Sequence, residues 1–94
     1  MTMKFSIDQL RVFATAAKSD SFGAAALDLG ISQPAVRKSI SQLETALGVE
    51  LFNRTRDKIT LTGNGIALLS DTLNVLEKVE HFNAKLDFIK KAHS

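Results

Sequence analysis

The sequence predicts a mainly α-helical fold in which three short helices and a two-stranded hairpin precede one long helix. Three observations indicate this fold. Apolar residues recur at helical spacing in three stretches, and a serine that can cap a helix precedes each of them. A polar, basic segment, residues 53–58, separates two short apolar stretches as a hairpin tip does. After Gly65 the chain contains neither proline nor glycine, so neither helix-breaking residue interrupts a long helix there.

The first two helices are predicted from their ends. Ser6 and Gln9 have the spacing of a capping box, in which each side chain accepts a hydrogen bond from the other residue's backbone amide. This helix is expected to end near Lys18. Ser21 is expected to cap the second helix, and Gly30 to end it, because glycine readily adopts the left-handed conformation found just past a helix.

The third helix combines an apolar stripe with a polar face. Ser32 is expected to cap it, Pro34 falls in its first turn, where a missing amide hydrogen costs nothing, and Gly48 ends it. The stripe consists of Val36, Ile40, Leu43 and Leu47. At about 100° per residue, the opposite face is made up of Pro34, Arg37, Lys38, Ser41 and Thr45, with Gln42 at its edge. Two helices joined by a tight turn, the second with an uncovered polar face, are typical of proteins that place one helix in the major groove of DNA.

The hairpin and the long helix complete the predicted fold. Residues 51–52 and 59–61 are expected to be the two strands. Thr62 then caps the long helix, which over residues 65–91 would extend about 40 Å at 1.5 Å per residue. Such a helix is longer than the domain it leaves.

We expect the long helix to pair two copies of the chain. The chain is accordingly divided into a domain, residues 1–63, and a linker or dimerisation helix, residues 64–94. An isolated helix with an exposed apolar face is marginal in water, and apolar spacings of three and four residues suit packing against another helix. The residues expected to form this homodimer contact are Leu69, Leu73, Val75, Leu76, Val79, Phe82, Leu86 and Ile89.

Composition excludes several classes of protein. The chain has no cysteine, so it can form neither a disulfide framework nor a thiolate metal site. Its start has no apolar run of signal-peptide length, and no fully apolar run exceeds the four residues of 66–69, which is far too short to span a bilayer. His81 and His93 belong to no ligand cluster. We therefore expect a cytoplasmic protein without metal, cofactor or membrane contact, and not an enzyme.

Positive charge is concentrated on two predicted elements. The net charge is only +2, but Arg37 and Lys38 are the only charged residues between residues 31 and 43. The hairpin carries Arg54, Arg56 and Lys58 against Asp57. A basic patch on two elements, with most acidic residues elsewhere, fits the binding of phosphate groups.

The third helix is the predicted reading helix. Gln33 can bond an adenine edge and Arg37 a guanine edge, each with two hydrogen bonds. The helix start presents free amides suited to a phosphate, and the hairpin would lie against the DNA backbone or in the minor groove. The residues expected to contact DNA are Ser32, Gln33, Pro34, Arg37, Lys38, Ser41, Gln42, Arg54, Arg56 and Lys58.

A set of motifs spans essentially the whole chain. They comprise Leu10, Phe13, Ser21-Phe22, Ala25-Ala26, Leu29, Ser32-Gln33-Pro34-Ala35-Val36, Ile40, Leu43-Glu44, Leu47-Gly48, Leu51-Phe52, Arg54, Leu61-Thr62 and Gly65. Together they resemble the N-terminal domain of LysR-type transcriptional regulators. The resemblance implies a winged helix-turn-helix that binds an imperfect inverted repeat of promoter DNA as a homodimer, with a tetramer in an intact parent protein. It also implies activation or repression of promoters, usually under control of a small-molecule inducer.

The chain departs from the family pattern at several positions. Gly23 stands where Thr or Ser is usual, Arg37 where Ser is common, Asp57 where the hairpin often has Arg, and Asn64 where Ala is usual. The family also carries a two-lobed effector-binding domain, which would take the inducer, after the linker helix. We therefore expect a truncated piece of a longer regulator, with a natural short regulator as the alternative. The competing function is a helical protein-interaction module whose long helix recruits a partner without touching DNA.

Overall fold

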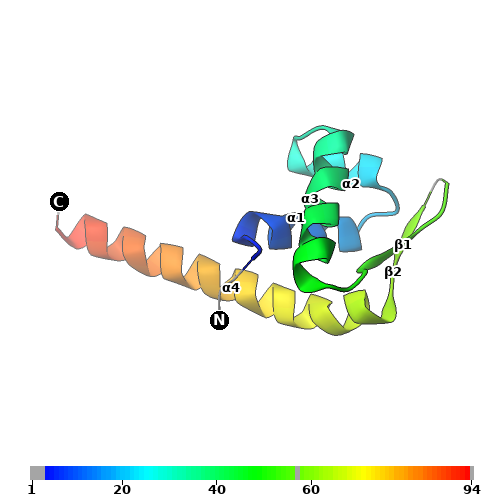
Figure 1. Cartoon of the computed structure of the whole chain (residues 1–94). Helices are drawn as coiled ribbons and strands as arrows, with labels where there is room; N and C mark the ends of the chain where they lie inside the picture. Colours follow the sequence, from blue (N-terminus) through cyan, green and yellow to red (C-terminus); the bar gives the residue numbers. More distant parts are fainter. Residues whose placement is uncertain (1–3, 57, 94) are drawn as a thin grey trace.

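The computed structural model describes residues 4–56 and 58–93, and its elements follow the predicted order. They are α1 (Ile7–Ala17), α2 (Phe22–Leu29), α3 (Gln33–Leu47), β1 (Phe52–Arg54), β2 (Ile59–Leu61) and α4 (Gly63–Ala92). Figure 1 shows α1, α2 and α3 packed together, the hairpin of β1 and β2 projecting at one end, and α4 running past the group and far beyond it at the other. The predicted winged helix-turn-helix with a long C-terminal helix is confirmed.

The helices begin and end at their capping residues. The Ser6 hydroxyl accepts from the Gln9 amide at 3.1 Å, and the Gln9 side chain accepts from the Ser6 amide at 2.9 Å, which completes the capping box. A hydroxyl also accepts from the backbone amide three residues on at Ser21, Ser32 and Thr62. Gly30 and Gly48 follow α2 and α3 with φ angles of 68° and 74°. Both glycines therefore adopt the left-handed conformation that ends a helix.

The core lies where the three short helices meet the hairpin. Its largest fully buried side chains are Phe13, Val36, Ile40, Leu43 and Leu51. Phe52 of β1 packs edge-to-face against Phe13 and Phe22, with ring centroids 5.8 Å apart in both pairs. Leu47, the last residue of the predicted α3 stripe, is partly buried. Burying each large apolar side chain contributes about 1.5–3 kcal/mol, so this cluster holds α3 and the hairpin against each other.

The first strand begins later and extends further than the sequence predicted. It was expected at residues 51–52, but Leu51 lies outside β1 because its amide donates to the Glu44 carboxylate at 2.7 Å. The strands are antiparallel, with facing pairs Phe52–Leu61, Asn53–Thr60 and Arg54–Ile59. Arg54, expected in the tip, is therefore part of a strand. Asp57, the acidic residue predicted in the hairpin, lies outside the described residues.

The first turns of α4 pack against the domain, and the rest of the helix does not. Leu68, Leu69 and Leu76 lie partly buried against the core. Arg11 of α1 reaches α4 through an ion pair with Glu80 at 3.4 Å. Every described residue from 80 onward is exposed. The division of the chain at residues 63 and 64 stays a prediction, since the start of α4 is continuous with the domain in its packing.

Candidate nucleic-acid interface

The polar face of α3 is open to solvent. Since Val36, Ile40 and Leu43 are buried, the side chains opposite them point away from the core. The residues of α3 and its cap that were predicted to contact DNA are all exposed: Ser32, Gln33, Pro34, Arg37, Lys38, Ser41 and Gln42. The start of α3, with the positive end of the helix dipole, therefore lies at the surface. A helix with one free polar face and an exposed N-terminus fits the width of a major groove.

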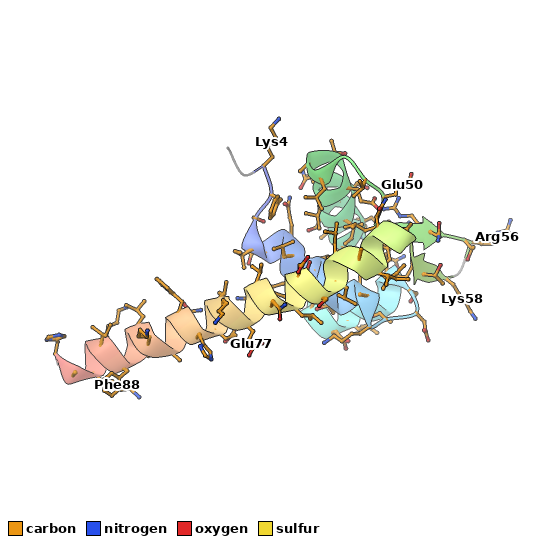
Figure 2. The ribbon with its side chains drawn as sticks, turned by 90° about the horizontal axis from the view of Figure 1, so that it is seen from below. Lys4, Glu50, Arg56, Lys58, Glu77 and Phe88 are labelled. Atoms are coloured by element: carbon orange, nitrogen blue, oxygen red, sulfur yellow. The ribbon has the colours of Figure 1, made fainter. Side chains whose placement is uncertain are left out.

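The start of α3 and the hairpin enclose a basic hollow of about 220 Å³. It is lined by Ser21, Phe22, Gly23, Gln33, Arg37, Arg54, Thr55, Arg56, Lys58 and Ile59. Figure 2 shows Arg56 and Lys58 extending from the hairpin away from the helices, at the opposite end of the molecule from Phe88. The structure thus brings together five of the ten residues predicted to bind DNA. Of the others, Ser41 and Gln42 line a separate hollow beside Lys4.

The side chains of Arg37 and Arg54 share a hydrophobic neighbour. The guanidinium carbons lie 5.4 Å and 5.6 Å from the centroid of the Phe22 ring, within the range of a cation–π contact. Arg54 also donates from Nη2 to Oε1 of Glu44 at 2.6 Å. Arg37 of α3 and Arg54 of the hairpin are therefore both held at the start of α2.

Sequence reasoning missed Phe22 and Glu44 as parts of this site. Phe22 was named only among the family motifs, and only 3% of it is exposed. Glu44 was likewise named only as part of the Leu43-Glu44 motif. Glu44 comes ten positions before Arg54, and its place at the end of the Leu43-Glu44 motif, shortly before the hairpin, was the signal available.

The apolar face of α4 is uncovered along much of its length. Leu73, Val75, Phe82, Leu86 and Ile89 are each at least 38% exposed. An open groove is lined by Asn74, Val75, Lys78, Val79 and Phe82. Two of the eight residues predicted to form the homodimer contact, Leu69 and Leu76, lie partly buried against the chain's own core. Of the other six, five are exposed and Val79 is partly exposed.

Comparison with known proteins identifies a family with this architecture. A family model described as "Bacterial regulatory helix-turn-helix protein, lysR family" matches residues 7–66. The chain belongs to the LysR family. The matched range of this LysR-family chain includes α1, α2, α3, both strands and the first turn of α4. The family consists of transcriptional regulators and not of enzymes.

Individual relatives agree with this assignment. The LysR-family chain is 39% identical over 90 residues to a protein of Thalassiosira pseudonana described as a probable RuBisCO transcriptional regulator, over 96% of this chain and 29% of that protein. The crystal structure of a CbnR DBD–DNA complex matches with a TM-score of 0.85 and 32% identity, over 90% of this chain and 98% of that one. A BenM DBD complex with catB site 1 DNA gives a TM-score of 0.86 at 27% identity, over 96% and 97% of the two chains. The chain thus spans less than a third of that curated relative and nearly the full length of both solved chains.

Within residues 4–56 and 58–93, no group of three or more His, Asp or Glu side chains is placed to hold a metal ion. No helix in that part of the chain is both long enough and apolar enough to cross a membrane.

Proposed function

We propose that this chain binds double-stranded promoter DNA through α3 and the hairpin, as the DNA-binding part of a LysR-type transcriptional regulator. The observation that carries the proposal is the basic hollow, in which Gln33 and Arg37 of α3 face Arg56 and Lys58 of the hairpin. One element offers hydrogen-bonding groups for base edges and the other offers charge for phosphates. A regulator of this kind acts where the DNA is, which in a bacterium is the cytoplasm.

We further propose that the chain acts as a homodimer paired through α4. A two-fold pair places two reading helices on an inverted repeat, and the exposed face of α4 supplies an apolar surface for the pairing. Assembly into a tetramer and control by a small-molecule inducer would belong to a longer parent protein, since the chain spans only 29% of the relative from Thalassiosira pseudonana.

Selection from a random double-stranded DNA library tests both proposals. We expect enrichment of an inverted repeat, and an affinity for it about 10³-fold or more above that for unrelated DNA. Fluorescence anisotropy over a salt series should show weaker binding as salt rises, because each phosphate contact releases a counterion.

The exposed face of α4 also favours the competing function, a protein-interaction module that does not touch DNA. That function predicts no enriched sequence and no salt-dependent binding, together with association of the chain through α4. Such a result would contradict the DNA-binding proposal.

A further inference from the structure

One carboxylate of α3 holds the start of the hairpin at three points. Glu44 Oε2 accepts from the Leu51 amide at 2.7 Å and from the Phe52 amide at 3.3 Å. Its other oxygen, Oε1, accepts from Arg54 Nη2 at 2.6 Å. The Glu44 side chain is only 10% exposed and that of Arg54 is 38% exposed, so water screens the two backbone bonds less than it screens the bond to Arg54. The position of β1 relative to α3 is therefore set directly by a side chain of α3.

Arg54 extends this connection to α2. Its guanidinium lies over the Phe22 ring, 5.6 Å from the centroid, while it bonds Glu44. A planar guanidinium can stack on a ring with its face and bond a carboxylate with its edge, whereas a lysine ammonium cannot do both. Arg37 lies over the same ring. The hairpin, the reading helix and the start of α2 thus meet around Phe22.

The electrostatics of Arg54 and Arg56 differ. Arg54 and Glu44 form a pair whose charges cancel, so together they attract a phosphate weakly. Arg56 is exposed and has no ion-pair partner among the residues that the structure describes. Only the unpaired cation contributes a full charge to counterion release when DNA binds.

We propose that Glu44 and Arg54 act as a clamp that fixes the angle of the hairpin to the reading helix, and that Arg54 is a positioning residue rather than a phosphate contact. The proposal rests on the proposed DNA-binding function and revises the role that the sequence suggested for Arg54. Phosphate contact by the hairpin then falls to Arg56 and Lys58, which Figure 2 shows extending from it.

A salt series on two matched variants tests the clamp. Arg54→Met removes the guanidinium but keeps an unbranched apolar side chain, and Arg56→Met removes the same group from the exposed position. Arg56→Met is expected to lower the slope of log affinity against log salt by about 0.9, the value for one phosphate contact. Made together with Glu44→Gln, so that no uncompensated carboxylate remains, Arg54→Met is expected to weaken binding about fivefold at every salt concentration with no change in slope. An equal loss of slope in both variants would overturn the clamp.

Amide hydrogen exchange in the free protein tests the same proposal without DNA. In Arg54→Met, the Leu51 and Phe52 amides should exchange about fivefold faster relative to the buried Phe13 amide, which reports global unfolding. In Arg56→Met this ratio should not change. Unchanged ratios in Arg54→Met would refute the clamp. If the wild-type protein bound no DNA, the proposed function would fail, and the exchange ratios would still decide for or against the clamp.

Discussion

At the residue scale, variants of three exposed side chains should distinguish a loss of sequence preference from a general loss of affinity for DNA. Gln33→Ala and Arg37→Ala are expected to lose discrimination at particular base pairs, at about 1–3 kcal/mol for each good pair of hydrogen bonds. Lys38→Ala is expected to weaken binding to operator and unrelated DNA alike, because a phosphate contact carries no sequence information. Library selection with each variant measures both effects. Unchanged selection profiles for both Gln33→Ala and Arg37→Ala would show that α3 is not the reading helix.

Gly23 controls the room available to Gln33. A Cβ at residue 23 would lie 3.3 Å from Gln33 Oε1, close enough that the side-chain amide of Gln33 must shift by a few tenths of an ångström. Gly23→Ala should therefore change the preference at the base pair that Gln33 contacts, by part of the roughly 1–3 kcal/mol that such a contact supplies. Selection profiles measure the change. In a Gln33→Ala background the same substitution should have no effect, and an effect that persisted there would contradict this explanation.

The candidate site could be predicted from sequence where helical periodicity or the polar hairpin segment governs it. The polar residues of α3 are exposed because the 3.6-residue repeat places them opposite Val36, Ile40 and Leu43. The pairing of Arg54 with Glu44 depends instead on how the hairpin folds back onto the end of α3. No repeat connects two residues ten positions apart across a turn and a strand, so this contact became visible only in the structure.

At the scale of elements, the start of α4 depends on a close approach at Gly65. A Cβ there would collide with the backbone carbonyl of Leu51 and would lie 2.9 Å from Leu61 Cδ2. A carbonyl fixed by the hairpin cannot easily move, so Gly65→Ala should lower the free energy of unfolding by about 1–3 kcal/mol, as overpacking does. Gly63→Ala is the matched control, because a Cβ at residue 63 meets nothing within 4 Å. Urea unfolding should show equal stability for the control and the wild type, or slightly higher for the control, and an equal loss in both variants would contradict the collision.

The ends of the helices were the most predictable elements, and the first strand was the least. Ser6, Ser21, Ser32 and Thr62 cap helices through bonds to amides three residues away, and such local bonds follow from residue type and spacing. The limits of β1 depend on which backbone amides find a partner across the hairpin. Because Glu44 takes the Leu51 amide, the strand begins at Phe52, a shift that hydrophobicity alone does not reveal.

At the scale of the whole molecule, the second half of α4 extends beyond the domain and is not covered by it. The molecule measures 53 × 32 × 19 Å along its principal axes, and Figure 1 shows the second half of α4 extending away from the other helices. The sequence predicted this excess of length and the apolar stripe. It could not show that Leu69 and Leu76 pack partly against the domain core, since the angle at which α4 leaves the hairpin decides which of its faces meets the domain.

The last prediction concerns the remaining stripe of α4. Pairing with a second copy would bury Val79 and Phe82, each worth about 1.5–3 kcal/mol when covered, so the double variant Val79→Glu, Phe82→Glu should be monomeric. Phe88→Glu is the control: at about 100° per residue Phe88 lies on the other side of the helix, and it is 73% exposed. We expect this control to stay dimeric. Sedimentation distinguishes monomer from dimer for each variant, and a wild-type monomer at high micromolar concentration would refute the pairing. The double variant should also bind an inverted repeat far more weakly than the distance of residues 79 and 82 from α3 suggests. In a dimer, binding of one DNA-binding domain holds the second at a high effective concentration near its half-site.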